Sequence, residues 1–285
     1  MRAVVFGAKG TLGQALAAAL PRAGFELAAA LDRAACDISD PAAIHAAFDR
    51  FAPEVVFNAA AYTDVDRAET EPDRAYAANA IAPETMARAA EATGAALVHY
   101  STDFVYDGES ERPYDEFDPP SPQGLYARSK VAGEALAAAA TRRLFIVRVG
   151  CLYGRGGRNF PSTILRRLKA GEVVRADRER QGSPTWVGEV AQVSAALART
   201  SWFGLYHCTS AGETSWAAFA HFLAGELGLP EGRVDPLPTS ALPMKAPRPR
   251  RAILDNRMLR LRGLDTMSNW QDAARAFLKS ESEAI

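Results

Sequence analysis

The segment Ala3-Val4-Val5-Phe6-Gly7-Ala8-Lys9-Gly10-Thr11-Leu12-Gly13 decides the fold, because it joins a short apolar run to a helical pattern through three glycines. A strand, a glycine-rich turn and a helix in this order are the context in which such a turn binds a dinucleotide. Glycines permit a tight turn and let a pyrophosphate approach the free amides at the helix N-terminus. We expect Gly7, Gly10 and Gly13 to form this phosphate site.

A second pattern lies downstream, in Tyr126-Ala127-Arg128-Ser129-Lys130. Residues four apart share one face of a helix. A lysine ammonium beside a phenol stabilises the phenolate and lowers the phenol pKa, so that the phenol can exchange a proton near neutral pH. Neither pattern is specific alone, but together they indicate a nicotinamide-dependent enzyme that acts on a carbonyl or a hydroxyl.

The composition is that of an ordinary globular protein. The 285 residues are 48% hydrophobic and 24% charged, with a formal net charge of -1. This charge gives no basic field for nucleic acid, and no apolar stretch is long enough to span a bilayer. The N-terminus lacks the pattern of a signal peptide, and Cys36, Cys151 and Cys208 show no metal-ligand spacing. We therefore expect reduced thiols in a cytoplasmic protein.

Strand and helix patterns alternate over the first half of the chain. The expected strands are 3–6, 27–31, 55–57, 96–100, 144–149 and 204–208. The expected helices are 12–20, 41–51, 72–93, 126–140, 160–170, 187–200 and 216–227. Such alternation predicts an α/β fold, a Rossmann-type doubly wound parallel sheet with ligands beyond the carboxyl ends of the strands.

The alternation of strand and helix patterns becomes irregular after Val149, where polar loops and a proline-rich, extended segment at 237–249 appear. No repeat or flexible linker separates the parts. We expect a smaller, interleaved C-terminal substrate domain. The dinucleotide-binding domain then takes 1–150 and 184–210, and the sugar-nucleotide-binding domain takes 151–183 and 211–285.

Further cofactor candidates follow the second and third strands. Asp32 favours NAD, because an acid there accepts hydrogen bonds from the adenosine ribose. Arg33 favours a 2′-phosphate instead, so the two cues oppose each other and the choice stays open. After the third strand, the small residues of Asn58-Ala-Ala-Ala-Tyr-Thr63 let a cofactor lie against the backbone.

Ser101-Thr102-Asp103 follows the fourth strand, also at a carboxyl end. A hydroxyl there can bind the substrate oxygen that Tyr126 protonates, although Thr102 or Asp103 can equally cap the next turn. The four histidines, His45, His99, His207 and His221, are scattered, and we interpret each as a packed or surface residue rather than a ligand.

The chain resembles the dTDP-4-dehydrorhamnose reductase family, which are extended short-chain dehydrogenases/reductases. The resemblance rests on three motifs, Asn58-Ala-Ala-Ala-Tyr-Thr-Asp-Val-Asp-Arg-Ala-Glu69, His99-Tyr-Ser-Thr-Asp-Phe-Val-Tyr-Asp-Gly108 and Tyr126-Ala-Arg-Ser-Lys-Val-Ala-Gly-Glu134. It continues through Gly157-Arg-Asn-Phe160, Gln181-Gly-Ser-Pro-Thr185, Gly204-Leu-Tyr-His207 and Arg248-Pro249, and so covers nearly the whole chain.

The resemblance implies hydride transfer from NADPH, with NADH possible, to C4 of a dTDP-linked 4-keto-6-deoxy sugar, which converts dTDP-4-dehydrorhamnose to dTDP-L-rhamnose. Tyr126 is then the proton donor, Lys130 holds the nicotinamide ribose, and Thr102 completes the grip on the C4 oxygen. The implied cofactor contacts are Gly7, Gly10, Thr11, Leu12, Gly13, Asp32, Arg33, Asp37, Ile38, Ala59, Ala60, Ala61, Tyr62, Thr63, Tyr126 and Lys130. The implied substrate contacts are Thr102, Asp103, Tyr126, Cys151, Asn159 and Arg248.

The chain departs from the family pattern at several positions. Ala127 replaces a glycine, and Glu179-Arg180-Gln181-Gly182 replaces Asp-Gln-x-Gly. Cys151 stands where a tryptophan commonly lies against the sugar, which puts the identity of the sugar in question. Some members bind magnesium through a glutamate where this chain has Ala15, so we predict no metal.

Two other readings remain open. A related epimerase oxidises and re-reduces the sugar on bound NAD, and a regulatory subunit of methionine adenosyltransferase resembles the same family but acts by binding a partner. The expected partner is a small dTDP-sugar substrate, without nucleic acid or membrane, and the chain is expected to be a monomer or homodimer.

Overall fold

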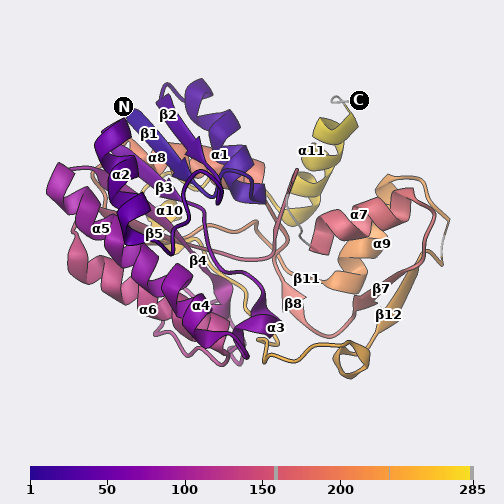
Figure 1. Ribbon diagram of the computed structural model, residues 1–285. Coiled ribbons are helices and arrows are strands. Elements are labelled where there is room, and N and C mark those ends of the chain that lie inside the picture. Colours follow the sequence, from indigo (N-terminus) through magenta and orange to yellow (C-terminus); the bar gives the residue numbers. More distant parts are fainter. Residues whose placement is uncertain (157–159, 231, 283–285) are drawn as a thin grey trace.

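The computed structural model describes residues 1–156, 160–230 and 232–282. Six parallel strands form one sheet in the order β10-β5-β4-β3-β1-β2 (Figure 1). The strands are β1 (Arg2–Phe6), β2 (Glu26–Leu31), β3 (Val55–Asn58), β4 (Ala96–Thr102), β5 (Leu144–Val149) and β10 (Gly204–His207). All six expected strands are present, and the predicted doubly wound α/β fold is confirmed.

Helices cover both faces of the sheet, which explains why its strands are continuous apolar runs. On one face lie α1 (Thr11–Arg22) and α8 (Val187–Ala198), which contribute Leu16 and Val190 to the core. On the other lie α2 (Pro41–Phe51), α5 (Ala82–Thr93) and α6 (Leu125–Ala140). Every residue of β3, β4 and β5 is buried.

The single helix expected at 72–93 consists of three parts. These are α4 (Pro72–Tyr76), the π-helical turn η1 (Ala77–Ile81) and α5, which ends at the left-handed Gly94. Pro83 has no N–H for the Asn79 carbonyl four residues earlier, and its ring would clash with that carbonyl in an α-helix. The wider turn accommodates the proline, as π-bulges do.

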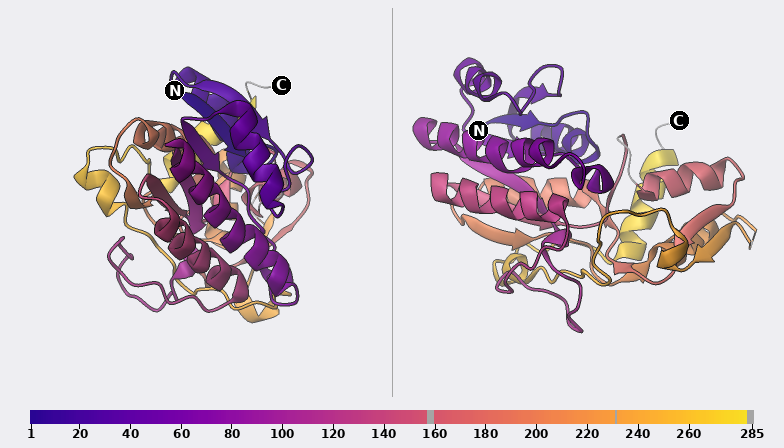
Figure 2. Two further views of the ribbon diagram at one scale, coloured as in Figure 1. Left: turned by 60° about the vertical axis from the view of Figure 1, so that its left-hand side comes forward. Right: turned by 60° about the horizontal axis from the view of Figure 1, so that its bottom comes forward.

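A second group of elements has its own core, beside the sheet (Figures 1 and 2). Its helices are α7 (Phe160–Lys169), α9 (Trp216–Glu226) and α11 (Trp270–Ser282). Its strands pair in two ribbons, β7 (Val174–Asp177) with β12 (Val234–Leu237) and β8 (Gln181–Gly182) with β11 (Thr214–Ser215). These ribbons and α11 were not predicted from the sequence.

Other short elements lie in the remaining segments. They are α3 (Val65–Ala68), η2 (Asp103–Val105), β6 (Leu152–Tyr153), β9 (Thr185–Trp186), η3 (Thr239–Ala241) and α10 (Arg257–Leu261). Leu259 of α10 packs in the core of the sheet, within a part of the chain that the sequence assigned to the second domain. The segment 237–249 is not extended throughout, because η3 is one helical turn within it. Among the described residues, no helix is long and apolar enough to cross a membrane.

Candidate active site

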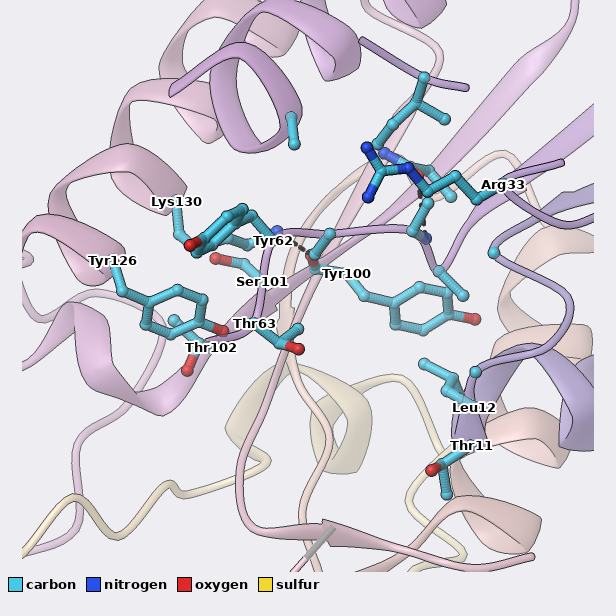
Figure 3. A pocket seen from close by; sticks show the side chains of 18 of the residues that line it. Thr11, Leu12, Arg33, Tyr62, Thr63, Tyr100, Ser101, Thr102, Tyr126 and Lys130 are labelled. Carbon is cyan, nitrogen blue, oxygen red and sulfur yellow. Dashed lines mark hydrogen bonds between the residues drawn. The ribbon is translucent and has the colours of Figure 1, made fainter. Parts of the chain in front are cut away.

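A cavity of about 850 Å³ opens at the carboxyl ends of the parallel strands. Most of the residues predicted for the site line it. They are Gly7, Gly10, Thr11, Leu12, Asp32, Arg33, Asp37, Ile38, Ala59, Ala60, Ala61, Tyr62, Thr63, Thr102, Asp103, Tyr126, Lys130 and Cys151. Figure 3 shows Thr102 and Tyr126 together on one side of this cavity and Arg33 on another, with Thr11 and Leu12 on α1.

The glycine-rich turn brings backbone against backbone at the start of α1. Gly7 has a φ of +79°, and a Cβ there would lie 2.6 Å from the Ala60 nitrogen. A Cβ on Gly13 would lie 2.1 Å from the Gly7 carbonyl oxygen. Gly13 therefore packs against the backbone of the turn and does not line the cavity. The N-cap Gly10 makes no side-chain cap, which leaves the helix N-terminus suited to an anion.

The acid at the end of β2 is paired with a lysine that the sequence reasoning did not single out. Lys9, inside the glycine-rich turn, forms an ion pair with Asp32, whose carboxylate also accepts a 2.9 Å hydrogen bond from the Ala35 amide. The hydrogen bond from Lys9 is the main cause that lowers the pKa of Asp32. Arg33 lies 3.4 Å from Asp37. Two cations and two carboxylates thus face one another at this end of the cavity.

The loop after β3 is fixed by a residue of the π-helical turn. The Tyr62 amide donates to Asn79 Oδ1 at 2.8 Å, and Asn79 Nδ2 donates to the Tyr62 carbonyl at 3.0 Å. Asn79 also donates to Ser129 Oγ on α6. The loop 59–63 and the helix that carries Tyr126 are therefore held by the same buried amide.

Thr102 is the last residue of β4 and Asp103 follows it, so both lie at the carboxyl end of this strand, as the sequence predicted. Thr102 Oγ1 donates to Asp103 Oδ1 at 3.0 Å and accepts from the Phe104 amide, so Thr102 also caps the short helix η2. The expected capping by Thr102 is found, and Thr102 also lines the cavity, while its hydrogen bond to a substrate oxygen stays a prediction. Burial raises the pKa of Asp103 to about 7, which makes this carboxyl a group that titrates near neutrality.

The N-terminal turn of α6 carries Tyr126. Its N-cap, Gly124, provides no side-chain cap, and the Leu125 amide donates instead to Glu69 Oε1 at 2.8 Å. The Tyr126 ring packs edge-on against Phe104 at 6.0 Å. Lys130, one turn later, is 2% exposed and donates to the Tyr100 carbonyl at 2.7 Å.

The expected lowering of the Tyr126 pKa by Lys130 is not found. Burial raises the pKa of this phenol to about 12, the Thr102 hydroxyl opposes the rise, and the charge of Asp103 adds to it. Lys130 is turned toward the Tyr100 carbonyl. Tyr126 is therefore protonated at neutral pH, which is the form that a proton donor needs.

Cys151 lines the cavity in an unusual backbone conformation. Its φ is +50°, a left-handed value that is uncommon for a residue with a Cβ. Burial, followed by the negative charge of Asp103, raises the pKa of its thiol well above the usual range, so this cysteine is a neutral, small group against the cavity. Cys36, Cys151 and Cys208 are all free thiols.

One predicted substrate contact, Arg248, is not found at the cavity. Arg248 is not among its lining residues, because its Nη1 donates to Asp66 at 2.9 Å. Asp66 also accepts from the Lys245 and Ala246 amides, and so fixes the proline-rich segment. Asn159 lies outside the described residues. The substrate contacts of Arg248 and Asn159 stay predictions.

Several lining residues were not predicted. They are Lys9, Cys36, Ser39, Asp73, Arg74, Ala77, Ala78, Tyr100, Val149, Gly150 and Leu152. Asn58 and Ser101 also line the cavity and belong to the predicted segments 58–63 and 101–103, and Tyr100 stands directly before the second of these. Asp73, Arg74, Ala77 and Ala78 come from α4 and the π-helical turn, and no sequence signal placed that helix at the cavity.

The residues present fit a dinucleotide. The cavity volume is of the size that encloses a cofactor-sized ligand. It extends from Asp32 and Arg33 past the uncapped N-terminus of α1 to Tyr126 and Lys130. Among the described residues there is no group of three or more His, Cys, Asp or Glu side chains arranged to hold a metal ion.

A sequence-family model described as RmlD substrate binding domain matches residues 1–283. The chain belongs to this family. A dTDP-4-dehydrorhamnose reductase of Streptomyces griseus is 39% identical over 95% of this chain and 91% of the relative. A dTDP-4-keto-6-deoxy-D-glucose reductase of Streptomyces niveus is 37% identical over 95% of this chain and 94% of the relative.

Solved structures agree with this assignment. The dTDP-4-dehydrorhamnose reductase of Bacillus anthracis, solved in complex with NADP, has a TM-score of 0.94 and 34% identity, and the match covers 98% of this chain and 99% of that one. The expectations of the reductase family, of an NAD(P)H-dependent oxidoreductase and of a nicotinamide cofactor are thereby confirmed. The reductive chemistry on a sugar nucleotide is supported at the level of the family.

Proposed function

We propose that the chain reduces the 4-keto group of dTDP-4-dehydrorhamnose to give dTDP-L-rhamnose, with NADPH as cofactor and NADH as a possible substitute. One observation carries the proposal: Thr102, Tyr126 and Lys130 line the same cavity as the glycine-rich turn. The relatives named above act on dTDP-linked 4-keto sugars by name, and one binds NADP.

The reaction adds a hydride to C4, which the nicotinamide supplies when it is bound. Tyr126 gives its phenolic proton to the oxygen on C4, where negative charge develops as the hydride arrives. The raised pKa of Tyr126 keeps that proton available at neutral pH. The Thr102 hydroxyl, at the end of β4, turns its single hydrogen from Asp103 to the same oxygen and so donates a second hydrogen bond there.

The remaining residues hold the two ends of the cofactor. Lys130 binds the nicotinamide ribose, and the glycine-rich turn receives the pyrophosphate at the N-terminus of α1. Asp32 and Arg33 face the adenosine ribose, with Asp37 and Ile38 near the adenine. Lys9 neutralises Asp32 through their ion pair. Neutralisation of this acid favours a 2′-phosphate, and we therefore propose that NADPH is preferred.

The sugar lies on the other side of Tyr126, between the sheet and the second group of elements. We propose that 151–183 and 211–285 form the sugar-nucleotide-binding domain, except for α10, which belongs with the sheet. Cys151 then lies at the domain boundary, against the sugar. Cys151 is smaller than the tryptophan that relatives commonly carry. We propose that this side of the site accepts a bulkier or differently oriented 6-deoxy sugar.

The test is oxidation of NADPH, followed at 340 nm, with dTDP-4-keto-6-deoxy-L-mannose as substrate and the D-gluco isomer as competitor. Turnover of the first with one NADPH consumed per sugar supports the proposal. Tightly copurified NAD with interconversion of sugars and no net NADPH consumption indicates the epimerase instead. No turnover, with a stable hetero-complex on a methionine adenosyltransferase, indicates the regulatory role.

A further inference from the structure

A buried row of hydrogen bonds connects the cofactor loop to Lys130. The Ala60 amide donates to Asn58 Oδ1 at 3.2 Å, and Asn58 Nδ2 lies 3.1 Å from His99 Nδ1. His99 Nε2 lies 3.5 Å from Lys130 Nζ. Asn58, His99 and Lys130 are 1%, 0% and 2% exposed, so water does not reach this row from outside the cavity.

The donor and acceptor roles along this row of hydrogen bonds are fixed by the Ala60 amide. A backbone N–H can only donate, so the Asn58 atom that faces the Ala60 amide must be the oxygen. The Asn58 NH₂ group therefore faces His99, and it too can only donate. The reverse orientation of the amide would place two N–H donors against each other.

His99 must consequently accept at Nδ1. Burial, with a further contribution from the charge of Lys130, lowers the pKa of His99 well below its usual value, so the ring is neutral at working pH. A neutral imidazole with an unprotonated Nδ1 carries its hydrogen on Nε2. That hydrogen points at Lys130 Nζ.

We propose that His99 is a positioning residue whose Nε2–H faces Lys130 Nζ and so favours the neutral amine of Lys130, which makes the Lys130 ammonium a readier proton donor within the site. An ammonium has three donors and no lone pair, and it would meet the imidazole donor head on. An amine accepts from Nε2–H and still donates to the Tyr100 carbonyl, which lies 2.7 Å away.

Burial and the neighbouring charged groups shift the pKa of Lys130 in opposite directions. Burial is the main cause that lowers the pKa of Lys130, to about 8, and Glu134 on the same helix raises it. Glu134 is itself held by Arg148, through contacts of 3.0 Å and 2.6 Å. On the cavity side lie Tyr126 and Asp103, of which Asp103 has a pKa near 7.

This inference rests on the proposed role of Lys130 in the reduction. After Tyr126 has given its proton to the sugar oxygen, the phenolate regains a proton from the Lys130 ammonium, either directly or through a hydroxyl between them. Lys130 is then an amine, and it recovers a proton from solvent as the product leaves. His99 makes loss of the proton from Lys130 easier without itself gaining or losing a proton.

The first test is the tautomer of His99 in the unmodified protein. The chain has four histidines, so a long-range ¹H–¹⁵N spectrum of the imidazoles can resolve each ring. We expect His99 as the neutral Nε2–H tautomer from pH 6 to pH 9. A neutral Nδ1–H tautomer, or a charged ring at pH 7, would overturn the proposal.

The second test follows Lys130 itself. The chain has five lysines, and ¹³Cε-labelled lysine would report the titration of each. In His99→Gln the amide oxygen can turn to Nζ, and the exchange of a donor for an acceptor should raise the Lys130 titration by about one to two pH units. The matched control is His207→Gln, on β10, whose ring contacts Tyr106 and not Lys130.

An unchanged Lys130 titration in His99→Gln, or an equal shift in His207→Gln, would contradict the inference. The pH profile of kcat should move with the lysine titration in the first variant and stay in place in the control. Both spectra are recorded without substrate. If the expected tautomer and titration are found but the enzyme does not reduce the sugar, the proposed function fails while the inference about Lys130 stands.

Discussion

Lys130 on α6 donates a 2.7 Å hydrogen bond to the carbonyl of Tyr100 on β4. The strand that ends in Thr102 and the helix that begins beside Tyr126 are therefore joined by a main-chain acceptor inside the core. The Lys130 side chain is 2% exposed and cannot leave this position without breaking that bond. The relative placement of Thr102, Tyr126 and Lys130 is thus set by the fold itself.

Replacement of Tyr126 by phenylalanine removes the proposed proton donor and keeps the ring that packs on Phe104. We expect kcat to fall by about 10²–10⁴-fold, the usual contribution of general acid catalysis, while the Kd for NADPH changes little. Steady-state kinetics and a fluorescence titration of NADPH measure the two effects. Turnover equal to that of the parent would show that Tyr126 is not the acid, and Asp103 would be the next candidate.

Replacement of Lys130 by methionine should impair both binding and turnover. The variant loses the hydrogen bond to Tyr100 and the contact proposed for the nicotinamide ribose. We expect the Kd for NADPH to rise by about tenfold, equivalent to about 1.4 kcal/mol, in addition to a loss in kcat. A normal Kd with reduced kcat would restrict Lys130 to the proton steps.

Lys9→Met is expected to change cofactor preference. The substitution leaves Asp32 without its ion pair, so the carboxylate would repel a 2′-phosphate and remain free to bind ribose hydroxyls. We expect the affinity for NADPH to fall by about tenfold while that for NADH is kept. Titrations with adenosine 2′,5′-bisphosphate and AMP isolate this end of the cofactor. Equal losses for both ligands would show that Lys9 does not discriminate.

Activity should survive removal of divalent metals. Ala15 offers no ligand where some relatives carry a glutamate, and oxygen ligands are what magnesium requires. We expect the same kcat and KM before and after dialysis against EDTA. Loss of turnover that magnesium restores would contradict this prediction.

The raised pKa of Asp103 predicts a stability change with a definite sign. Burial raises its pKa from 3.8 to about 7, so the folded state binds a proton that the unfolded state releases between these values. The stabilisation is present below about pH 4 and is lost as the pH rises to about 7. Asp103→Asn removes the cost of the buried negative charge. The variant should therefore be more stable than the parent at pH 8, by up to about 4 kcal/mol, with little difference at pH 4.

Urea denaturation at both pH values measures this difference. Asp66→Asn is a control of opposite sign, because the hydrogen bond from Arg248 lowers the pKa of Asp66 well below its usual range. That variant should be less stable than the parent at pH 8. If Asp103→Asn gained equal stability at both pH values, titration of Asp103 would not be the cause.

The sheet could be predicted because its strands are buried on both faces and read as short apolar runs between turns. The strand-end residues of the site follow from the same reasoning, since parallel strands place their carboxyl ends at one edge. The ion pair of Lys9 with Asp32 and the contact of His99 with Lys130 depend instead on side chains from elements far apart in the sequence.

His99 illustrates the limit of the sequence argument. Alternation along β4 places it on the same face as Leu97, which packs in the cluster that includes Ala137 of α6. That pattern is equally typical of a histidine buried for packing alone. Only the position of Lys130 on the neighbouring helix, and the orientation of the Asn58 amide, distinguish the two interpretations.

The number of residues in the π-helical turn η1 determines which side chains of α4 face the cavity. A π-turn holds one residue more than the α-helical turn it replaces, and one residue of an α-helix corresponds to a rotation of about 100°. A single deletion within 77–81 would restore regular winding and rotate α4 about its axis by that angle. Asp73 and Arg74, which now line the cavity, would turn away from it, and the Asn79 clamp on Tyr62 would be lost. Conservative substitutions should therefore be tolerated in this turn far better than any change in its number of residues.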